Sequence, residues 1–324
     1  MINFSTDELR PHERFDHWRE VRGKKLFGVT IELERERRAD FTGRFAAAAV
    51  GGATLARMDA SAYQVSRTAT DISRMPSDSL VIFEQVAGPG WCDTGRGDPF
   101  HVTGGELIAG HSDQPYACTP ATVSHFRFRA LSIPPDAETE FSGSARDLAI
   151  APLDPGGDRY FRLIAAAFSA LFDTGERLAE PEAKKAVGDL AQLLLLSRAL
   201  ARPGSWRSRN ALRSGYVEAA RQVMKRNLHR MNLSPETVAA ALAISVRQVH
   251  LLFEPSGKSF MRSLATIRIE EACRLLREAP EQQVADIGFA CGFHSLATFY
   301  RAFREVEGLA PTDYRRMMQE RADH

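Results

Sequence analysis

The chain has 324 residues, of which 44% are hydrophobic and 26% are charged, and its formal net charge at pH 7 is +1. This length predicts two domains, and the composition is that of a globular protein. The apolar stretches are too short to span a bilayer, and the N-terminus lacks a basic segment followed by an apolar run, so we expect a cytoplasmic protein without a membrane segment.

Residues 1 to about 28 are predicted to be largely helical. Ser5 is expected to cap a helix that runs through Phe15, Trp18 and Val21 and packs on the body of the protein. From about Val29 to Ile133 the pattern changes to short β-type runs separated by Gly, Pro, Asp and Ser. These runs are Val29–Glu34, Ala53–Ala56, Tyr63–Ser66, Leu80–Phe83, Gly105–Ala109 and Val123–Arg129. Runs at this spacing predict a β-barrel or a β-sandwich, without giving the strand order.

Four cysteines, Cys92, Cys118, Cys273 and Cys291, are scattered without Cys-x-x-Cys spacing. We therefore expect reduced thiols and no zinc site. Cys273 and Cys291 fall on apolar helix faces and are expected in the core.

Residues 158–200 predict a pair of amphipathic helices, interrupted near Asp173–Glu176 and near Glu180–Glu182. The pair either covers one side of the barrel or forms a dimer contact, and the sequence leaves both possibilities open. Residues 201–213 have the composition of an interdomain linker. Tyr216–Leu228 is expected to be the leading helix of the C-terminal domain.

The C-terminal region contains the same helical unit twice. In the first unit, Ser234 and Pro235 predict the start of a short helix, and Ser245 with Gln248 forms a capping box that predicts the start of a second. The apolar stripe of this second helix is Val249, Leu252 and Phe253. Two helices joined by a tight turn predict a helix-turn-helix, whose second helix fits the major groove of DNA.

The second unit runs from Val284 to Phe303, with Gly292 at the turn. Its expected core is Ile287, Phe293, Phe299 and Phe303. Between the units, Ser259–Arg277 predicts a connecting helix roughly 27 Å long. This length approaches the roughly 34 Å between successive major-groove faces, so one rigid connector can present both units to DNA. Residues 210–324 hold 16 Lys and Arg against 13 Asp and Glu, a net charge of +3, whereas the rest holds 26 against 28, or −2.

Six spaced patterns occur across this region: Ser245-x-x-x-Val249-x-x-x-Phe253, Gly257-x-Ser259-Phe260, Arg268-x-x-x-Ala272-x-x-Leu275-Leu276, Ile287-x-x-x-x-Gly292-Phe293, Phe299-x-Arg301-x-Phe303 and Gly308-x-x-Pro311-x-x-Tyr314-Arg315. Their joint spacing resembles the DNA-binding domain of AraC/XylS-type bacterial transcription regulators. Three residues depart from the family pattern: Leu251 replaces a basic residue, Gly288 an alanine, and Ala243 a turn glycine or asparagine.

The resemblance implies a regulator, most commonly an activator, that binds double-stranded promoter or operator DNA, acts with RNA polymerase and forms a homodimer. It implies an α+β fold, with domain 1–200 as a cupin-like barrel with flanking helices, linker 201–213, and domain 214–324 as an all-α domain with two helix-turn-helix units joined by a long helix. The expected DNA-binding residues are Arg247, His250, Leu251, Ala297, Thr298, Arg301, Lys258, Arg262 and Arg304. Among these, we assign base contacts to Arg247, His250, Thr298 and Arg301, and phosphate contacts to Lys258, Arg262 and Arg304.

The N-terminal half more loosely resembles the cupin-like sensor domain of the same family, through Glu13–Trp18, Val65–Thr68 and Gly104–His111. The resemblance implies a small effector, often an aromatic acid or amine, inside the barrel. The candidate effector residues are Tyr63, Arg67, Phe83, Trp91, His111 and Tyr116, with Arg67 as the partner of an effector carboxylate.

Two alternatives stay open. A regulator controlled by a protein partner needs no small effector and is expected to have a filled barrel interior. A metal-dependent cupin enzyme needs a His-x-His pair with further ligands, whereas His101, His111 and His125 are isolated. We therefore expect no enzyme activity, no cofactor and no metal site. Gly88–Gly90 and Gly95–Gly97 lack the lysine-serine pair of a phosphate-binding loop and are predicted to lie in a long hairpin connection.

Overall fold

The computed structural model describes residues 2–120, 124–135, 143–254, 257 and 259–322. The chain divides into two compact units, Met1–Gly215 and Tyr216–His324, and the boundary falls within helix α6 (Trp206–Asn227). An N-terminal β domain and a C-terminal helical domain are therefore present, as the sequence predicts. The predicted linker 201–213 includes the first residues of α6.

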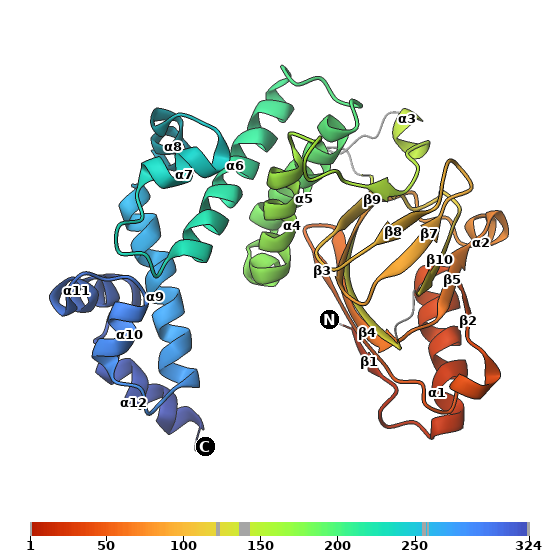
Figure 1. Ribbon diagram of the computed structural model, residues 1–324, viewed down its shortest axis with the longest axis horizontal. Coiled ribbons are helices and arrows are strands. Elements are labelled where there is room, and N and C mark those ends of the chain that lie inside the picture. Colours follow the sequence, from red (N-terminus) through yellow and green to blue (C-terminus); the bar gives the residue numbers. More distant parts are fainter. Residues whose placement is uncertain (1, 121–123, 136–142, 255–256, 258, 323–324) are drawn as a thin grey trace. The chain divides into compact units, whose positions relative to one another are not determined.

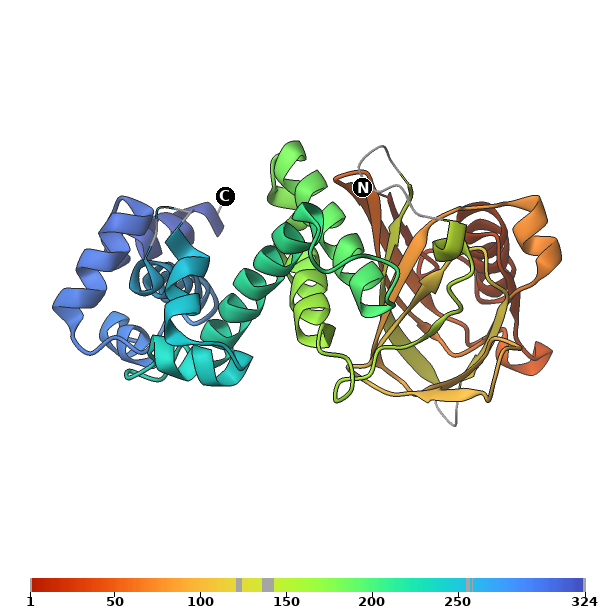
Figure 2. The ribbon, with the colours of Figure 1, turned by 90° about the horizontal axis from the view of Figure 1, so that it is seen from above.

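Two antiparallel sheets form the body of the N-terminal unit (Figure 1, Figure 2). The first sheet has the order β1 (Ile2–Ser5), β3 (Gly43–Val50), β4 (Ala53–Ser61), β11 (His125–Ile133), β6 (Leu80–Ala87), β9 (Leu107–His111) and β12 (Ala151–Pro152). The second has the order β2 (Thr30–Glu32), β5 (Gln64–Arg67), β10 (Tyr116–Pro120), β7 (Gly90–Asp93) and β8 (Phe100–Val102). Each predicted β-type run overlaps one of these strands; Val123, in the last run, lies outside the described residues.

The N-terminal segment differs from its prediction. Ser5 does not cap a helix, because it lies in β1 and pairs with Arg44 of β3. The helix α1 (Pro11–Trp18) begins later and continues as a π-helix, η1 (Arg19–Phe27), which ends at Gly28 with φ +57°. Phe15 and Trp18 are buried in one cluster with residues of both sheets, so this segment does pack on the body of the domain.

The prediction of four reduced cysteines is wrong for two of them. Cys92 of β7 and Cys118 of β10 form a disulfide. They are direct partners in the antiparallel ladder, with Cα atoms 4.2 Å apart. Their 26-residue separation conceals this pairing in the sequence, because only the strand register brings them together. Cys273 and Cys291 are free and buried, as predicted, and burial raises the pKa of each thiol to about 12.

The helices α4 (Phe161–Thr174) and α5 (Glu180–Ser197) are joined through a 3₁₀ turn, η3 (Gly175–Arg177). Their apolar residues, Phe168 and Leu194 among them, are buried within the chain. Short helices α2 (Ala69–Arg74), α3 (Gly143–Arg146) and the 3₁₀ turn η2 (Arg35–Arg37) lie in the loops. The apolar faces predicted for the helix pair in residues 158–200 are therefore buried by packing within the chain.

The second unit is helical. Its elements after α6 are α7 (Pro235–Leu242), α8 (Val246–Phe253), α9 (Phe260–Glu278), α10 (Val284–Ala290), α11 (Leu296–Glu307) and α12 (Pro311–Ala322). Among the described residues, no single helix is long and apolar enough to cross a membrane; α7 and α8 reach that length and composition only when joined across their 104° bend.

Candidate nucleic-acid interface and effector cavity

Helices α7 and α8 form the first helix-turn-helix. The predicted capping box is present at the start of α8: Gln248 N donates to Ser245 Oγ at 3.2 Å, and Ser245 N donates to Gln248 Oε1 at 2.8 Å. Ala243 takes a left-handed conformation, with φ +54°, between the two helices. Ser234 occupies the N-cap of α7 but forms no side-chain cap hydrogen bond, so that prediction is wrong in its mechanism.

Helix α8 buries one face and exposes the other. Val249 and Phe253 are buried, whereas Arg247, His250 and Leu251 are exposed. Leu251 keeps 43% of its surface exposed. An exposed leucine beside a cationic side chain suits contact with a thymine methyl group, which lies in the major groove.

Helices α10 and α11 form the second helix-turn-helix. Ser295 caps α11 by accepting from Thr298 N at 3.3 Å, and Phe299 and Phe303 are fully buried. The outward residues are Ala297, Thr298, Arg301 and Arg304. Arg301 and Arg304 form no side-chain ion pair with any residue that the structure describes, so their guanidinium groups are available to a nucleic acid.

Helix α9 connects the two units. Its start and end, Phe260 and Glu278, agree closely with the prediction, and Ser259 caps it by accepting from Arg262 N at 3.2 Å. Arg262 donates through Nε and Nη2 to Glu305 Oε1 of α11, at 3.1 and 2.7 Å. A phosphate contact by Arg262 therefore has to compete with this exposed ion pair. Lys258 lies outside the described residues.

The buried side of α9 fixes its position against the end of α6. Arg268 is buried, and it donates to Leu228 O at 2.9 Å and to Arg230 O at 2.7 Å. Its guanidinium lies 5.7 Å from the Phe293 ring centre. Arg268 therefore links three parts of the unit: the segment after α6, helix α9 and the turn between α10 and α11.

The N-terminal unit contains a cavity of about 140 Å³. Four predicted effector residues line it: Tyr63, Phe83, Trp91 and Tyr116. Phe126 and Phe128, which are not among the predicted effector residues, add two stacked rings with centres 5.8 Å apart. The disulfide pair Cys92 and Cys118 also lines the cavity.

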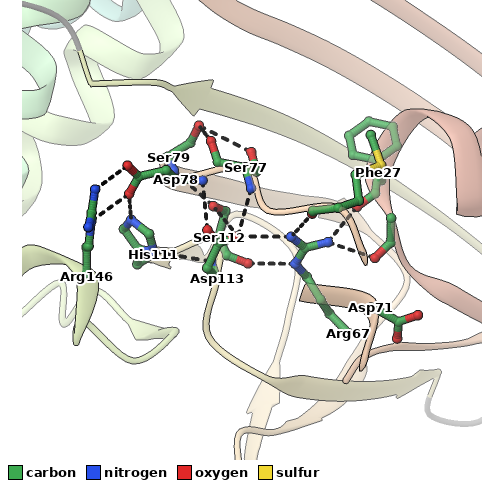
Figure 3. A network of polar contacts seen from close by, with 12 residues as sticks. Phe27, Arg67, Asp71, Ser77, Asp78, Ser79, His111, Ser112, Asp113 and Arg146 are labelled. Carbon is green, nitrogen blue, oxygen red and sulfur yellow. Dashed lines mark hydrogen bonds and ion pairs between the residues drawn. The ribbon is translucent and has the colours of Figure 1, made fainter. Parts of the chain in front are cut away.

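Arg67 does not line this cavity, and the prediction that it binds an effector carboxylate needs correction. The side chain is 4% exposed, and all five of its N–H groups have acceptors (Figure 3). The acceptors are Ser112 O (2.7 Å), Phe27 O (2.9 Å), Gly28 O (2.7 Å), Met75 O (2.8 Å) and Asp113 Oδ1 (3.0 Å). Because a guanidinium has five donors, none is left for a ligand.

His111 also lies outside the cavity, within the same buried polar network (Figure 3). Its Nδ1 accepts from Asp113 N at 3.2 Å, and its Nε2 lies 3.3 Å from Asp78 Oδ1. Burial would raise the pKa of Asp113, but the backbone N–H groups of Ser77 and Asp78 and the Arg67 guanidinium outweigh it and lower that pKa. Asp113 is therefore an ionised hub of the network, and His111 is structural.

The buried His111 should make the stability of the N-terminal unit depend on pH. Burial lowers its pKa below the ordinary value, outweighing the attraction of Asp113 and Asp78. Below about pH 6.5 the unfolded chain binds a proton that the folded chain binds less readily, so stability falls as the pH falls through this range. We expect the loss of melting temperature between pH 7.5 and pH 5.5 to be smaller in His111→Gln than in the unmodified chain.

The control for this measurement is His12→Gln, because the His12 side chain is 73% exposed. It should keep the full pH dependence. Equal pH dependence in the His111 and His12 variants would contradict a role for His111 in acid sensitivity.

The remaining predicted histidines do not converge. His101 of β8 stacks against Trp91, with ring centres 4.9 Å apart, and His125 of β11 pairs with Asp59. Within the described ranges, no group of three or more His, Cys, Asp or Glu side chains could hold a metal ion.

Arg22 is a further cavity residue that sequence reasoning missed, besides Phe126 and Phe128. It lies in η1, lines the cavity and is 5% exposed. The sequence predicts only packing on the body of the protein for this segment. The only signal in the sequence was an arginine among the apolar positions of an amphipathic segment, and such residues commonly lie at the surface.

The C-terminal region is similar to a helix-turn-helix family and to two transcriptional activators. A helix-turn-helix domain family matches residues 238–317. Over 95 residues the chain is 35% identical to the transcriptional activator NphR of Rhodococcus sp and 32% identical to the transcriptional activator RhrA of Rhizobium meliloti (strain 1021). Each match covers 29% of this chain, and they cover 28% of NphR and 30% of RhrA, so the chain matches less than a third of either relative. The chain is also similar to the AraC-like transcriptional activator CuxR, which has a crystal structure and is 20% identical in sequence. The two structures align with a TM-score of 0.46, over 90% of this chain and 100% of that chain.

Proposed function

We propose that this chain, whose residues 238–317 belong to the AraC/XylS type of helix-turn-helix domain, is a transcription activator that binds a specific promoter sequence and responds to a small effector. The observation that carries the proposal is the paired arrangement of α8 and α11. Each helix follows a tight turn, buries its aromatic side and exposes a polar side, on which Arg247 of α8 and Arg301 and Arg304 of α11 form no ion pair with a described residue.

The geometry of the C-terminal unit supports double-stranded DNA as the partner. Helix α9 has 19 residues, a length of roughly 28 Å, which is close to one turn of the DNA helix. On this proposal α8 and α11 enter successive major-groove segments. Arg247, His250, Thr298 and Arg301 contact base edges, and Arg304 contacts phosphate together with Lys258 and Arg262.

The cavity supports a small effector over the alternative of control by a protein partner. That alternative predicts a filled barrel interior, whereas this interior has space lined by aromatic side chains. A metal-dependent enzyme is the weaker alternative; metal bound to the purified protein would favour it. The proposal also includes action with RNA polymerase and assembly into a homodimer. Both of these are inferred from the family resemblance alone.

Arg301→Ala tests the DNA-binding part. The variant should bind promoter DNA about 5- to 150-fold more weakly and lose base preference at one position, because a good bidentate contact contributes roughly 1 to 3 kcal/mol of discrimination. DNA selected by the full chain from a random library supplies the promoter sequence, and binding to single-base variants of it is then measured at fixed salt.

Arg316→Ala is the matched control. Arg316 is 72% exposed on α12, outside both helix-turn-helix units, and pairs with Asp313. It should leave base preference unchanged. Unchanged affinity and unchanged base preference in Arg301→Ala would remove Arg301 from the contact surface.

A further inference from the structure

We propose that the cavity of the N-terminal unit takes a small, single-ring aromatic effector that carries a negative charge, and that Arg22 holds this charge. The inference rests on the proposed function, since it specifies the effector that this function requires. It rests on a buried cation, two of whose nitrogen atoms have no hydrogen-bond acceptor among the described residues, at the wall of a small aromatic cavity.

The size and lining of the cavity restrict the ligand. Its volume of about 140 Å³ is close to that of an engineered apolar cavity of roughly 150 Å³ that binds benzene. Its walls include the rings of Tyr63, Phe83, Trp91, Tyr116, Phe126 and Phe128. A planar ring with one small substituent fits such a space, and stacking and edge contacts with these side chains stabilise it.

The charge of the ligand follows from Arg22. Three arginines are buried among the described residues: Arg22, Arg67 and Arg268. Arg67 donates five hydrogen bonds and Arg268 two, whereas Nε and Nη1 of Arg22 are buried without any acceptor. Leaving a buried charged donor unpaired is costly, so a ligand that supplies an acceptor gains that interaction.

Aromatic rings partly compensate the charge of Arg22. Its guanidinium lies 4.8 Å from the Phe27 ring centre, 5.8 Å from that of Tyr63 and 5.9 Å from that of Phe128. These contacts stabilise a cation but satisfy no N–H donor. A carboxylate can accept two hydrogen bonds side by side from Nη1 and Nη2, or from Nε and Nη2, which is the paired arrangement that a guanidinium favours.

The buried positive charge of Arg22 also excludes a cationic effector. An aromatic cage alone suits an ammonium group, but the permanent positive charge of Arg22 in this cage repels one. Burial raises the pKa of Tyr63 and of Tyr116, so both phenols stay neutral at pH 7 and add no negative charge that could attract an amine. The π-helix that carries Arg22 is itself a rare conformation, found frequently at functional sites.

The test measures binding of three probes to the full chain by calorimetry: benzoate, its neutral counterpart benzamide, and the cation benzylamine. Benzoate should bind, and the other two should bind at least tenfold more weakly. Arg22→Met should weaken benzoate binding by about 10- to 100-fold, because charged hydrogen bonds are lost. Arg22→Lys keeps the positive charge but loses the paired donors of the guanidinium. Its benzoate affinity should lie between that of the unmodified chain and that of Arg22→Met.

Arg44→Met is the matched control, since Arg44 is 72% exposed; it should bind benzoate like the unmodified chain. Thermal unfolding without ligand provides a measurement independent of the probe. Arg22→Met should melt at a temperature equal to or higher than that of the unmodified chain, because it removes a buried unpaired charge. A lower melting temperature would show that Arg22 stabilises the empty domain, and would overturn the proposal.

Failure of benzoate to bind, equal binding of benzamide, or full benzoate affinity in Arg22→Met would each overturn the inference. Promoter binding, measured on the same samples, separates this failure from failure of the proposed function. Sequence-specific DNA binding without benzoate binding would contradict only the effector assignment. Benzoate binding without sequence-specific DNA binding would contradict the proposed function and would leave the cavity assignment unaffected.

Discussion

Arg67→Met is expected to destabilise the N-terminal unit by about 3 to 5 kcal/mol, the range for breaking a buried charge pair by removing one partner. The substitution leaves Asp113 as a poorly compensated carboxylate. It also removes the donors for four backbone oxygens, those of Phe27, Gly28, Met75 and Ser112. These oxygens come from segments far apart in the sequence, so their loss should loosen the connection of η1, α2 and the loop after β9.

Urea unfolding followed by tryptophan fluorescence measures this effect, because Trp18, Trp91 and Trp206 all lie in the N-terminal unit. Arg44→Met again serves as the control. Its ion pair with Asp7 is exposed, and such pairs contribute about 0 to 1 kcal/mol. Similar losses in the two variants would mean that the five hydrogen bonds of Arg67 do not stabilise the domain beyond a surface pair.

Gly292→Ala is the second large change, and it should destabilise the C-terminal unit by more than about 3 kcal/mol. Gly292 has φ +82°, a left-handed conformation that costs other residues roughly 1 to 2 kcal/mol. A Cβ atom here would also lie 2.2 Å from Leu228 O and 2.9 Å from Arg268 Nη2. The backbone oxygen cannot move away without breaking the hydrogen bond from Arg268 Nε.

Gly308→Ala separates the two causes. Gly308 has φ +77° at the end of α11, and nothing lies within 4 Å of a Cβ atom built there. It should therefore cost only the conformational part, roughly 1 to 2 kcal/mol. Urea unfolding of the full chain, followed by far-ultraviolet circular dichroism and promoter binding, compares them. Equal losses would mean that the contact with Leu228 O relaxes freely.

The C-terminal unit was predictable because its signals are local. The capping box of Ser245, the periodic apolar positions of α8 and α11 and the turn glycine are each read within a few residues. The comparisons confirm the family resemblance of this region. The residues assigned to DNA contact stay a prediction, although all of those described are exposed.

The N-terminal unit was less predictable because its contacts are remote. Strand β3 was missed, since its run Ala46–Ala49 lacks the β-branched and aromatic residues that indicate strands; it forms because β1 and β4 flank it. The difference between Arg67, whose donors are all satisfied, and Arg22, which lines the cavity, has the same origin. Both arginines are buried, and only the fold shows which one has its donors satisfied. The cupin-like character of this unit stays a prediction.

The division of α11 into a buried and an exposed face has an evolutionary consequence. Phe299 and Phe303 have no exposed surface, whereas Thr298 and Arg301 face outward. Surface substitutions away from such packed residues usually change stability by less than about 0.5 kcal/mol. On the proposed function, descendants of this chain can therefore acquire new target promoters by changing a few outward residues of α8 and α11, without first accumulating compensating changes in the core.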